Sequence, residues 1–267
     1  MDKVFKNFDL EGKTIVITGT GSGIGQSIAV GLALEGARVA MLERDIDGLE
    51  ATVEMIRKNG GETLPLLCDV SDQVAVGKAA AKVKNWFGAA DVLINNAGMI
   101  LPGPLSELSI ENWHKVLSVN LTGYFLCAQT FGLGMLAQRR GALVHIASIA
   151  ADHPTPNSGA YSVAKAGVKM LSRQLAIEWG PSGIRSNVIN PGLIYTALSA
   201  DMYSRPGVTE AREATIPNRR IGKPKDIVDA VLFLSSDRSE YVNGAEITVD
   251  GAFTSNLLSL IPRAGYD

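Results

Sequence analysis

The chain has 267 residues, of which 46% are hydrophobic, so it is long enough for an α/β domain with a large buried core. Its 25 basic and 27 acidic residues give a formal net charge of −2. That balance argues against nucleic acid or an anionic membrane surface as a partner, and no apolar run is long enough to predict a membrane span.

Short strand-like segments alternate with longer helix-like segments along the chain. Strands are predicted at residues 14–18, 38–42, 64–68, 92–95, 142–147, 186–189 and 245–249. Helices are predicted at residues 23–34, 49–58, 73–87, 111–138, 160–179 and 225–234. This alternation indicates parallel β-α-β units with right-handed crossovers. We therefore predict one doubly wound α/β domain over residues 1–267, with about seven parallel strands and helices on both faces.

Two segments depart from this alternation. Residues 193–222 contain Pro206, Gly207 and Pro217 and have weak helical periodicity. Since open α/β sheets bind ligands beyond the carboxyl ends of their strands, we expect a substrate loop or lid here rather than a plain surface insertion. Residues 252–267 form an apolar tail, which would leave a patch that soluble monomers avoid. We expect the tail to pack on a neighbouring subunit or, alternatively, on its own.

Cysteine and histidine usage points away from disulfides and metals. Cys68 and Cys127 form no CxxC motif, and His114, His145 and His153 form no zinc motif. The amino-terminal residues lack the apolar segment of a secretory leader. We therefore predict free, buried, reduced cysteines, no metal site and a cytoplasmic protein.

A glycine-rich turn joins the first predicted strand to the first predicted helix. Residues 18–25 read TGTGSGIG, a GxxxGxG spacing rather than the usual GxGxxG. Glycines allow backbone N–H groups to approach a pyrophosphate, and the helix amino terminus adds a positive dipole end. The turn therefore predicts a dinucleotide site formed by Gly19, Ser22, Gly23, Ile24 and Gly25.

Glu43 lies at the end of the second predicted strand, about 20 residues beyond the glycine-rich turn. A carboxylate there would accept hydrogen bonds from the adenosine ribose and would repel a 2′-phosphate. Arg44 follows immediately and could hold such a phosphate. Because Glu43 should dominate at the strand tip, we predict NAD rather than NADP as the cofactor.

Tyr161 and Lys165 stand four residues apart on a predicted helix, so they share one face. An ammonium beside a phenol favours the phenolate and lowers the pKa of the tyrosine toward working pH. Tyr161 is therefore a candidate general base. A Tyr-x-x-x-Lys pair is common, however, and indicates little when it stands alone.

Further motifs share the order and spacing of a known family. They are Asn95-Asn96-Ala97-Gly98, Val119-Asn120, Ser148, Tyr161-Ser162-Val163-Ala164-Lys165 and the NPGLIYT run at residues 190–196. With the TGxxxGIG turn, they resemble the short-chain dehydrogenase/reductase family, in its single-domain, NAD-preferring branch. The resemblance extends over about residues 10–252 and implies a Rossmann-type domain.

The resemblance implies roles for the matched residues. Tyr161 would exchange a proton with the substrate oxygen, Ser148 would position that oxygen, and Lys165 would tune Tyr161 and hold the nicotinamide ribose. Asn120 would anchor a water that links Lys165 to solvent. As alternatives, Ser148 could only cap a turn and Asn120 could only bridge a helix distortion. The further cofactor contacts implied are Asp69 and Val70 at the adenine, Asn96, Ala97 and Gly98 at the ribose, Ile194 and Thr196 at the carboxamide, and also Pro191 and Gly192.

The implied reaction is hydride transfer between NAD and a secondary alcohol or its ketone, the substrate being a cyclic alcohol, a polyol or sugar, or a hydroxyacyl compound. Two alternatives remain, an NADPH-dependent 3-oxoacyl-thioester ketoreductase and a non-catalytic NAD-binding sensor or scaffold.

The resemblance also suggests a homotetramer, built in part from the helices at 111–138 and 160–179. The candidate substrate contacts are Met99, Ile100, Ala150, Asp152, His153, Leu193, Leu198, Met202 and Tyr203.

Overall fold

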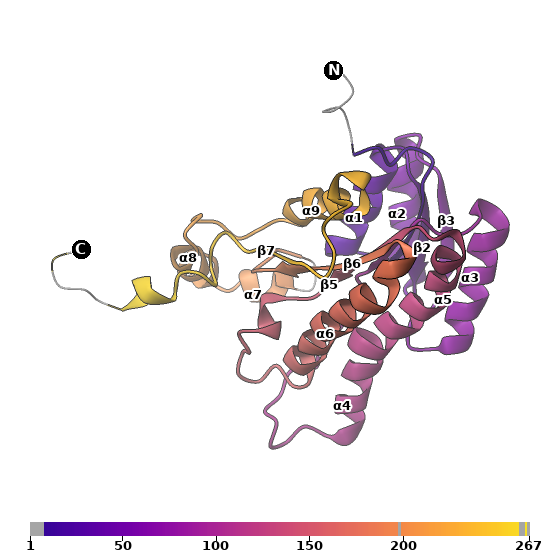
Figure 1. Cartoon of the computed structure of the whole chain (residues 1–267). Helices are drawn as coiled ribbons and strands as arrows, with labels where there is room; N and C mark the ends of the chain where they lie inside the picture. The colour runs from indigo at the N-terminus through magenta and orange to yellow at the C-terminus, as the bar shows by residue number, and fades with distance from the viewer. Residues whose placement is uncertain (1–7, 197–198, 262–264, 266–267) are drawn as a thin grey trace.

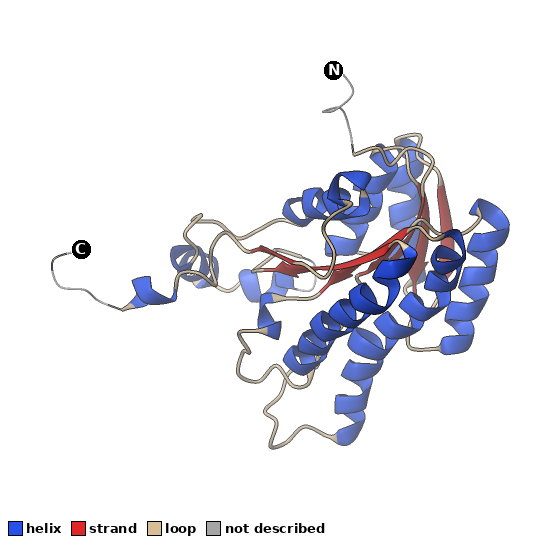
Figure 2. Ribbon diagram, viewed as in Figure 1, coloured by secondary structure: helices blue, strands red, loops and turns tan. Residues whose placement is uncertain are grey.

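Seven strands form one parallel sheet through the centre of the fold (Figure 2). The computed structural model of the chain describes residues 8–196, 199–261 and 265. The strands lie in the order β3-β2-β1-β4-β5-β6-β7, which confirms the predicted doubly wound sheet. Their bounds are β1 Thr14–Thr18, β2 Arg38–Glu43, β3 Thr63–Leu67, β4 Val92–Asn95, β5 Gly141–Ile146, β6 Ile184–Pro191 and β7 Glu246–Val249.

The register of the sheet brings the carboxyl ends of the strands to one edge. Thr18 of β1 pairs with Leu42, so that Glu43 follows at the tip of β2. The order of the strands reverses between β1 and β4, and this reversal is where open α/β sheets bind ligands. All five residues of β1, TIVIT, are buried, as expected for a strand covered by helices on both faces.

Helices cover both faces of the sheet (Figure 1). On one face, α1 (Gly23–Leu34), α2 (Ile46–Lys58) and α9 (Lys225–Ser235) share a core that includes Leu32, Ile56 and Val231. On the other face, α3 (Gln73–Phe87), α5 (Gly123–Gln138) and α6 (Tyr161–Trp179) share a second core that includes Phe131 and Leu175. Cys68 and Cys127 also lie in this second core, free and buried as predicted.

The helix predicted at residues 111–138 is interrupted. The structure has α4 (Ile110–Leu117), a π-helical turn at Ser118–Thr122, and then α5. Among the described residues, Ile110–Gln138 is the stretch long and apolar enough to cross a membrane, but 56% of its most apolar part is buried inside the fold. Its packing against α3 and α6 is that of a core helix.

The segment predicted as an irregular substrate loop contains two short helices, α7 (Ala200–Tyr203) and α8 (Val208–Thr215). Its base is closed by an isolated bridge between Ile194 and Gly222, where the Gly222 N–H donates to Leu193 O at 2.9 Å. Periodicity missed α8 because the helix spans two turns and buries none of its residues. Leu198 lies outside the described residues.

The described part of the carboxyl-terminal tail, as far as the short helical turn at Leu257–Leu260, extends away from the body of the molecule (Figure 1). Phe253 packs against Tyr203, Ile216 and Ile221 of its own chain. Beyond it, Leu257 is 70% exposed, and Leu258 and Ile261 are also exposed. Packing on its own subunit therefore accounts for Phe253 but not for these later side chains.

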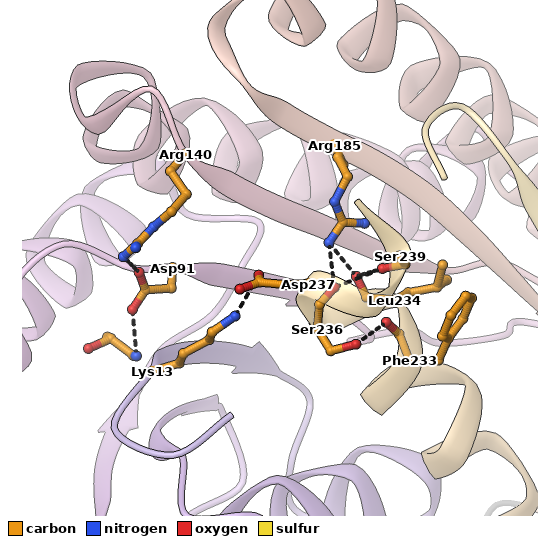
Figure 3. A network of polar contacts seen from close by, with 10 residues as sticks. Lys13, Asp91, Arg140, Arg185, Phe233, Leu234, Ser236, Asp237 and Ser239 are labelled. Carbon is orange, nitrogen blue, oxygen red and sulfur yellow. Dashed lines mark hydrogen bonds and ion pairs between the residues drawn. The ribbon is translucent and has the colours of Figure 1, made fainter. Parts of the chain in front are cut away.

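Polar contacts join the elements at the amino ends of the strands, opposite the ligand-binding edge (Figure 3). Lys13 pairs with Asp237 at 2.8 Å, and Arg140 pairs with Asp91 at 2.7 Å. Arg185 donates to the carbonyl oxygens of Leu234 and Ser236 at the end of α9. The contacts of Lys13 and Arg185 fix the end of α9 to the sheet, and the Arg140–Asp91 pair joins the starts of β5 and β4.

Candidate active site

One cavity of about 610 Å³ lies along the carboxyl ends of the strands. Every site residue predicted from the sequence lines it except Asn120. The candidate substrate contacts divide: Met99, Ile100, Leu193, Met202 and Tyr203 line the cavity, whereas Ala150, Asp152 and His153 are not part of its wall. Asp152 instead accepts a hydrogen bond from Lys169 at 2.6 Å, so an ion pair on the protein occupies its carboxylate.

The glycine-rich turn has no room for side chains. Gly19 has a φ of +72°, and a Cβ there would lie 2.6 Å from the Cα of Ala97. A Cβ on Gly25 would collide with the carbonyl oxygen of Gly19. Ser22 caps α1 without a side-chain hydrogen bond, so backbone N–H groups at the amino end of this helix remain available to an anion.

Thr18, which the sequence analysis did not single out, fixes the turn to the loop after β4. Its Oγ1 accepts hydrogen bonds from the N–H groups of Asn96 and Ala97, both at 3.0 Å. The Asn96 side chain donates back to the carbonyl oxygens of Thr18 and Gly19. The Thr that opens the TGxxxGIG run was the available signal, because a hydroxyl beside a tight turn is a ready acceptor.

Glu43 lies at the tip of β2 and its carboxylate lines the cavity. Oε2 accepts from Gly21 N at 2.8 Å, and Oε1 accepts from Arg44 N at 2.7 Å and Asp45 N at 3.0 Å. The residue therefore holds the glycine-rich turn as well as presenting negative charge. Nearby, burial raises the pKa of Asp69, but hydrogen bonds from Ser71 and the charge of Arg44 outweigh it and lower the pKa overall.

Lys165 is buried at the other end of the cavity. Its Nζ donates to the hydroxyl of Tyr124 at 3.0 Å and to the carbonyl oxygen of Ile146 at 2.8 Å. The same Nζ lies 5.8 Å from the centre of the Tyr161 ring. Burial lowers the pKa of Lys165 to about 7, so its charge changes near neutral pH.

The expected lowering of the pKa of Tyr161 is wrong for this chain. Desolvation raises the pKa of Tyr161 above its ordinary value, and the hydroxyl of Ser148 lowers it only in part. The physical reason is that Lys165 directs its hydrogen bonds at Tyr124 and Ile146, while burial disfavours the phenolate. The four-residue spacing predicts that the two side chains share one helix face, but it does not predict the burial that raises the pKa of Tyr161.

Ser148 lines the cavity and also caps a turn, since its Oγ accepts from Ala150 N at 3.1 Å. Asn120 lies in the π-helical turn, where Nδ2 donates to the carbonyl oxygens of Met99 and Val116. The bridging of a helix distortion, considered as an alternative for Asn120, is thus present in the structure. A Cβ on Gly98 would lie 2.9 Å from Asn120 Oδ1 and 3.7 Å from Lys165 Nζ, so this glycine keeps the space between them open.

Tyr124 is a second residue that sequence reasoning missed. Its ring is buried, and its hydroxyl donates to the carbonyl oxygen of Ile146 at 3.0 Å while accepting from Lys165. A tyrosine on the inward face of a core helix was the available signal, because a buried phenol requires a polar partner. Arg212 of α8, also unpredicted, lines the cavity beside Tyr203.

Comparisons with known proteins agree with this architecture. A family model described as enoyl-(acyl carrier protein) reductase matches residues 19–254. D-threitol dehydrogenase of Mycolicibacterium smegmatis is 38% identical over 248 residues, which covers 93% of this chain and 95% of that protein.

Two solved structures carry different nucleotides. One from Agrobacterium tumefaciens, provisionally described as a 2-deoxy-D-gluconate 3-dehydrogenase with bound NADP, has a TM-score of 0.87 at 36% identity and covers 94% of this chain and 99% of its own. NAD+-bound xylitol dehydrogenase has a TM-score of 0.88 at 29% identity and covers 91% of this chain and 99% of its own. The family match, the sequence identity and the shared sheet lead to one conclusion: the chain belongs to the short-chain dehydrogenase/reductase family and is an oxidoreductase that binds a nicotinamide dinucleotide.

Proposed function

We propose that the chain is an NAD-dependent dehydrogenase that interconverts a secondary alcohol and its ketone, with Tyr161 as the general acid/base. The observation that carries this proposal is the arrangement of Ser148, Tyr161 and Lys165 around one cavity with the glycine-rich turn. A non-catalytic sensor would have no need of a general base in that position, which favours an enzyme over a binding protein.

The protein residues divide the work of the oxidation. A bound nicotinamide supplies the hydride acceptor. Ser148 donates a hydrogen bond that orients the substrate hydroxyl, and Tyr161 takes the proton from that hydroxyl as the hydride leaves the carbon. Lys165 is held by Tyr124 and Ile146, and its ammonium form offsets the negative charge that develops on the Tyr161 oxygen. In the reverse direction Tyr161 returns the proton to the ketone oxygen.

Glu43 supports NAD as the cofactor. Its carboxylate lies at the tip of β2, with Asp45 and Asp69 also in the cavity wall. Three carboxylates at this end would repel a 2′-phosphate, with Arg44 as the opposing cation. The NADP bound to the Agrobacterium relative keeps NADP as the alternative, and a titration with both nucleotides decides between them.

For the substrate we propose a secondary alcohol of the polyol or sugar kind. D-threitol dehydrogenase, a relative in sequence, and xylitol dehydrogenase, a structural neighbour, are named for polyols. The described wall near Tyr161 combines apolar side chains with the hydroxyls of Ser148 and Tyr203. Such a mixture suits a small molecule that carries both carbon–hydrogen faces and hydroxyls.

The test is a screen of secondary alcohols with NAD and with NADP, followed by absorbance of the reduced nicotinamide at 340 nm. We expect NAD-dependent oxidation of at least one polyol or sugar. Reduction of 3-oxoacyl thioesters with NADPH, without polyol oxidation, would instead favour the ketoreductase alternative. Tight NAD binding with no turnover on any alcohol or ketone would favour a sensor or scaffold.

We also propose a cytoplasmic homotetramer. Apolar side chains are exposed on the outer faces of α5 and α6, among them Leu133, Met170 and Ile177, and on the tail at Leu257 and Leu258. Burial of these side chains between subunits would remove them from water. Light scattering of the full chain, compared with a chain truncated after Phe253, measures both the assembly and the tail's part in it.

A further inference from the structure

We infer that Arg212 binds an anionic group of the substrate, so that the preferred substrate is a secondary alcohol bearing a carboxylate or phosphate. This inference rests on the proposed function, because it assigns the chemistry of the substrate in the same cavity. Arg212 belongs to α8, in the segment that follows β6, and lines the cavity together with Ser148 and Tyr161.

An aromatic pair fixes the guanidinium in the wall of the cavity. The Cζ of Arg212 lies 5.3 Å from the centre of the Tyr203 ring, and Nη1 donates to the Tyr203 hydroxyl at 3.2 Å. Tyr203 in turn stacks on Tyr195, with 5.3 Å between ring centres. A guanidinium has five N–H donors, so this stacking positions the group while leaving most of its donors for a ligand.

Arg212 has no carboxylate partner among the residues that the structure describes. The ion pairs of this part of the chain join other groups, including Arg220 with Asp226 and Lys169 with Glu246. The adjacent Glu213 accepts from Ile221 N at 3.3 Å. A half-buried cation beside apolar walls is most stable opposite an anion, and a guanidinium matches the geometry of carboxylate and phosphate oxygens.

The distribution of charge along the cavity places this anion site at the substrate end. Glu43, Arg44, Asp45 and Asp69 follow β2 and β3, on one side of the sheet. Arg212 comes from the other side, after β6, where Leu193 and Met202 supply apolar wall. Lys165 already donates to two protein oxygens. In the described wall, Arg212 is therefore the cation at the substrate end whose donors are not directed at a carboxylate or at backbone.

Two other roles would also place a cation here. Arg212 could contact a phosphate of the dinucleotide, in which case its loss would weaken nucleotide binding for every substrate. Alternatively, it could only support Tyr203, in which case its loss would impair charged and neutral substrates alike. Each role predicts a different pattern in the same set of measurements.

The experiment compares Arg212→Met with Arg205→Met in the full chain. Arg205 is exposed, lies outside the cavity wall and gives the same change in net charge. The substrates are sugar acids and sugar phosphates, each paired with the uncharged alditol of equal chain length. The measurements are kcat/KM for each substrate, the Kd of NAD and NADH, and the rise in Tm caused by each compound in the presence of NADH.

We expect the unmodified chain to prefer one anionic class over its neutral partner by at least about tenfold in kcat/KM. Arg212→Met should remove most of that preference, chiefly through KM, and should abolish the rise in Tm with the anion. Neutral substrates, nucleotide Kd and Arg205→Met should change by less than about threefold. The sugar acids and sugar phosphates reveal whether the group is a carboxylate or a phosphate.

Three results would overturn the inference: equal kcat/KM for charged and neutral partners in the unmodified chain, equal losses for both in Arg212→Met, or a parallel loss of nucleotide affinity. Each of these leaves the dehydrogenase activity intact, so it is distinct from failure of the proposed function, which would appear as no oxidation of any alcohol. In that event the Tm series still decides whether Arg212 binds the anion.

Discussion

The hydroxyl of Tyr124 lies 3.0 Å from the Nζ of Lys165, and both groups donate to the carbonyl oxygen of Ile146. Helix α5, helix α6 and strand β5 thus meet at one buried triangle of polar atoms behind the cavity. Because Nζ is held on two sides, its approach to Tyr161 is set by the core of the protein.

Tyr124→Phe tests whether the Tyr124 hydroxyl positions Lys165, because the variant removes the oxygen that accepts a hydrogen bond from Nζ. Loss of the phenolic acceptor disfavours the ammonium of Lys165 and lowers its pKa further, so Tyr161 loses part of the positive charge that favours its phenolate and deprotonates at higher pH. We expect a fall in kcat of about tenfold, little change in the Kd of NAD, and a shift of the acid limb of the oxidation profile to higher pH. Tyr241→Phe, which removes a fully exposed hydroxyl, is the matched control. An unchanged pH profile would mean that Tyr124 acts only in packing.

Cofactor preference should depend on Glu43. We expect NAD to bind at least about tenfold more tightly than NADP, equivalent to about 1.4 kcal/mol, and Glu43→Gln to narrow this ratio by removing the negative charge. Because Glu43 also accepts from Gly21 N, the variant should lose some affinity for NAD itself. Fluorescence titrations with both nucleotides measure the ratio. NADP binding that equals NAD binding in the unmodified chain would contradict the assignment.

Proton transfer should depend on Tyr161 more than nucleotide binding does. Tyr161→Phe keeps the ring but removes the exchangeable proton, so turnover should fall by about 10²-fold or more while the Kd of NAD changes far less. Since desolvation raises the pKa of Tyr161, alcohol oxidation by the unmodified chain should increase with pH through the alkaline range. Single-turnover rates measure the chemical step, and a flat alkaline profile would show that another group accepts the proton.

The stability of the fold should depend on pH through Lys165. Its pKa is lowered from 10.5 to about 7, so between these values the unfolded chain binds a proton that the folded chain does not. The contribution to stability is therefore complete above 10.5 and is lost as pH falls toward 7, with a slope of at most about 1.4 kcal/mol per pH unit. Urea unfolding of the chain and of Lys165→Met at several pH values measures this contribution of Lys165 to the free energy of unfolding. Identical pH dependence of the two proteins would show that Lys165 is not the cause.

The segment 199–222 should become less accessible when ligands bind. Its base is closed by the Ile194–Gly222 bridge, and it has its own small cluster around Tyr203, Ile216 and Ile221. If this segment closes over the substrate, limited proteolysis within α8 should slow in the presence of NAD and substrate. Cleavage at α2, a helix outside the segment, serves as the internal reference, and equal rates with and without ligands would indicate a static surface.

The elements of the fold that could be predicted are those with a distinctive pattern of residues in the local sequence. The β-branched run at Thr14–Thr18 and the glycines that follow it report a buried strand and a tight turn directly, and both are present. The π-helical turn at Ser118–Thr122 keeps the apolar pattern of a helix, so spacing could not reveal it. Helix α8 buries no residue and therefore has no apolar stripe to detect.

Properties that depend on tertiary burial were beyond the sequence. The pKa of Tyr161 follows from desolvation and from the direction of the Lys165 hydrogen bonds, neither of which is visible in a Tyr-x-x-x-Lys spacing. Tyr124 and Lys165 stand 41 residues apart and meet only because α5 and α6 pack together. The individual roles of the site residues remain predictions that the variants above test.

The bridge between Ile194 and Gly222 brings the two ends of the intervening segment together just beyond β6, before the chain continues into α9. Thr196 lies against Gly23 of the glycine-rich turn and must be retained, but α7 and α8 lie outside the seven strands. Exchange of this segment, together with Arg212 and Tyr203, for that of another family member offers a route to a new substrate preference on an unchanged scaffold. Substrate choice would then be set by one exchangeable segment, while the residues that carry out hydride transfer stay the same.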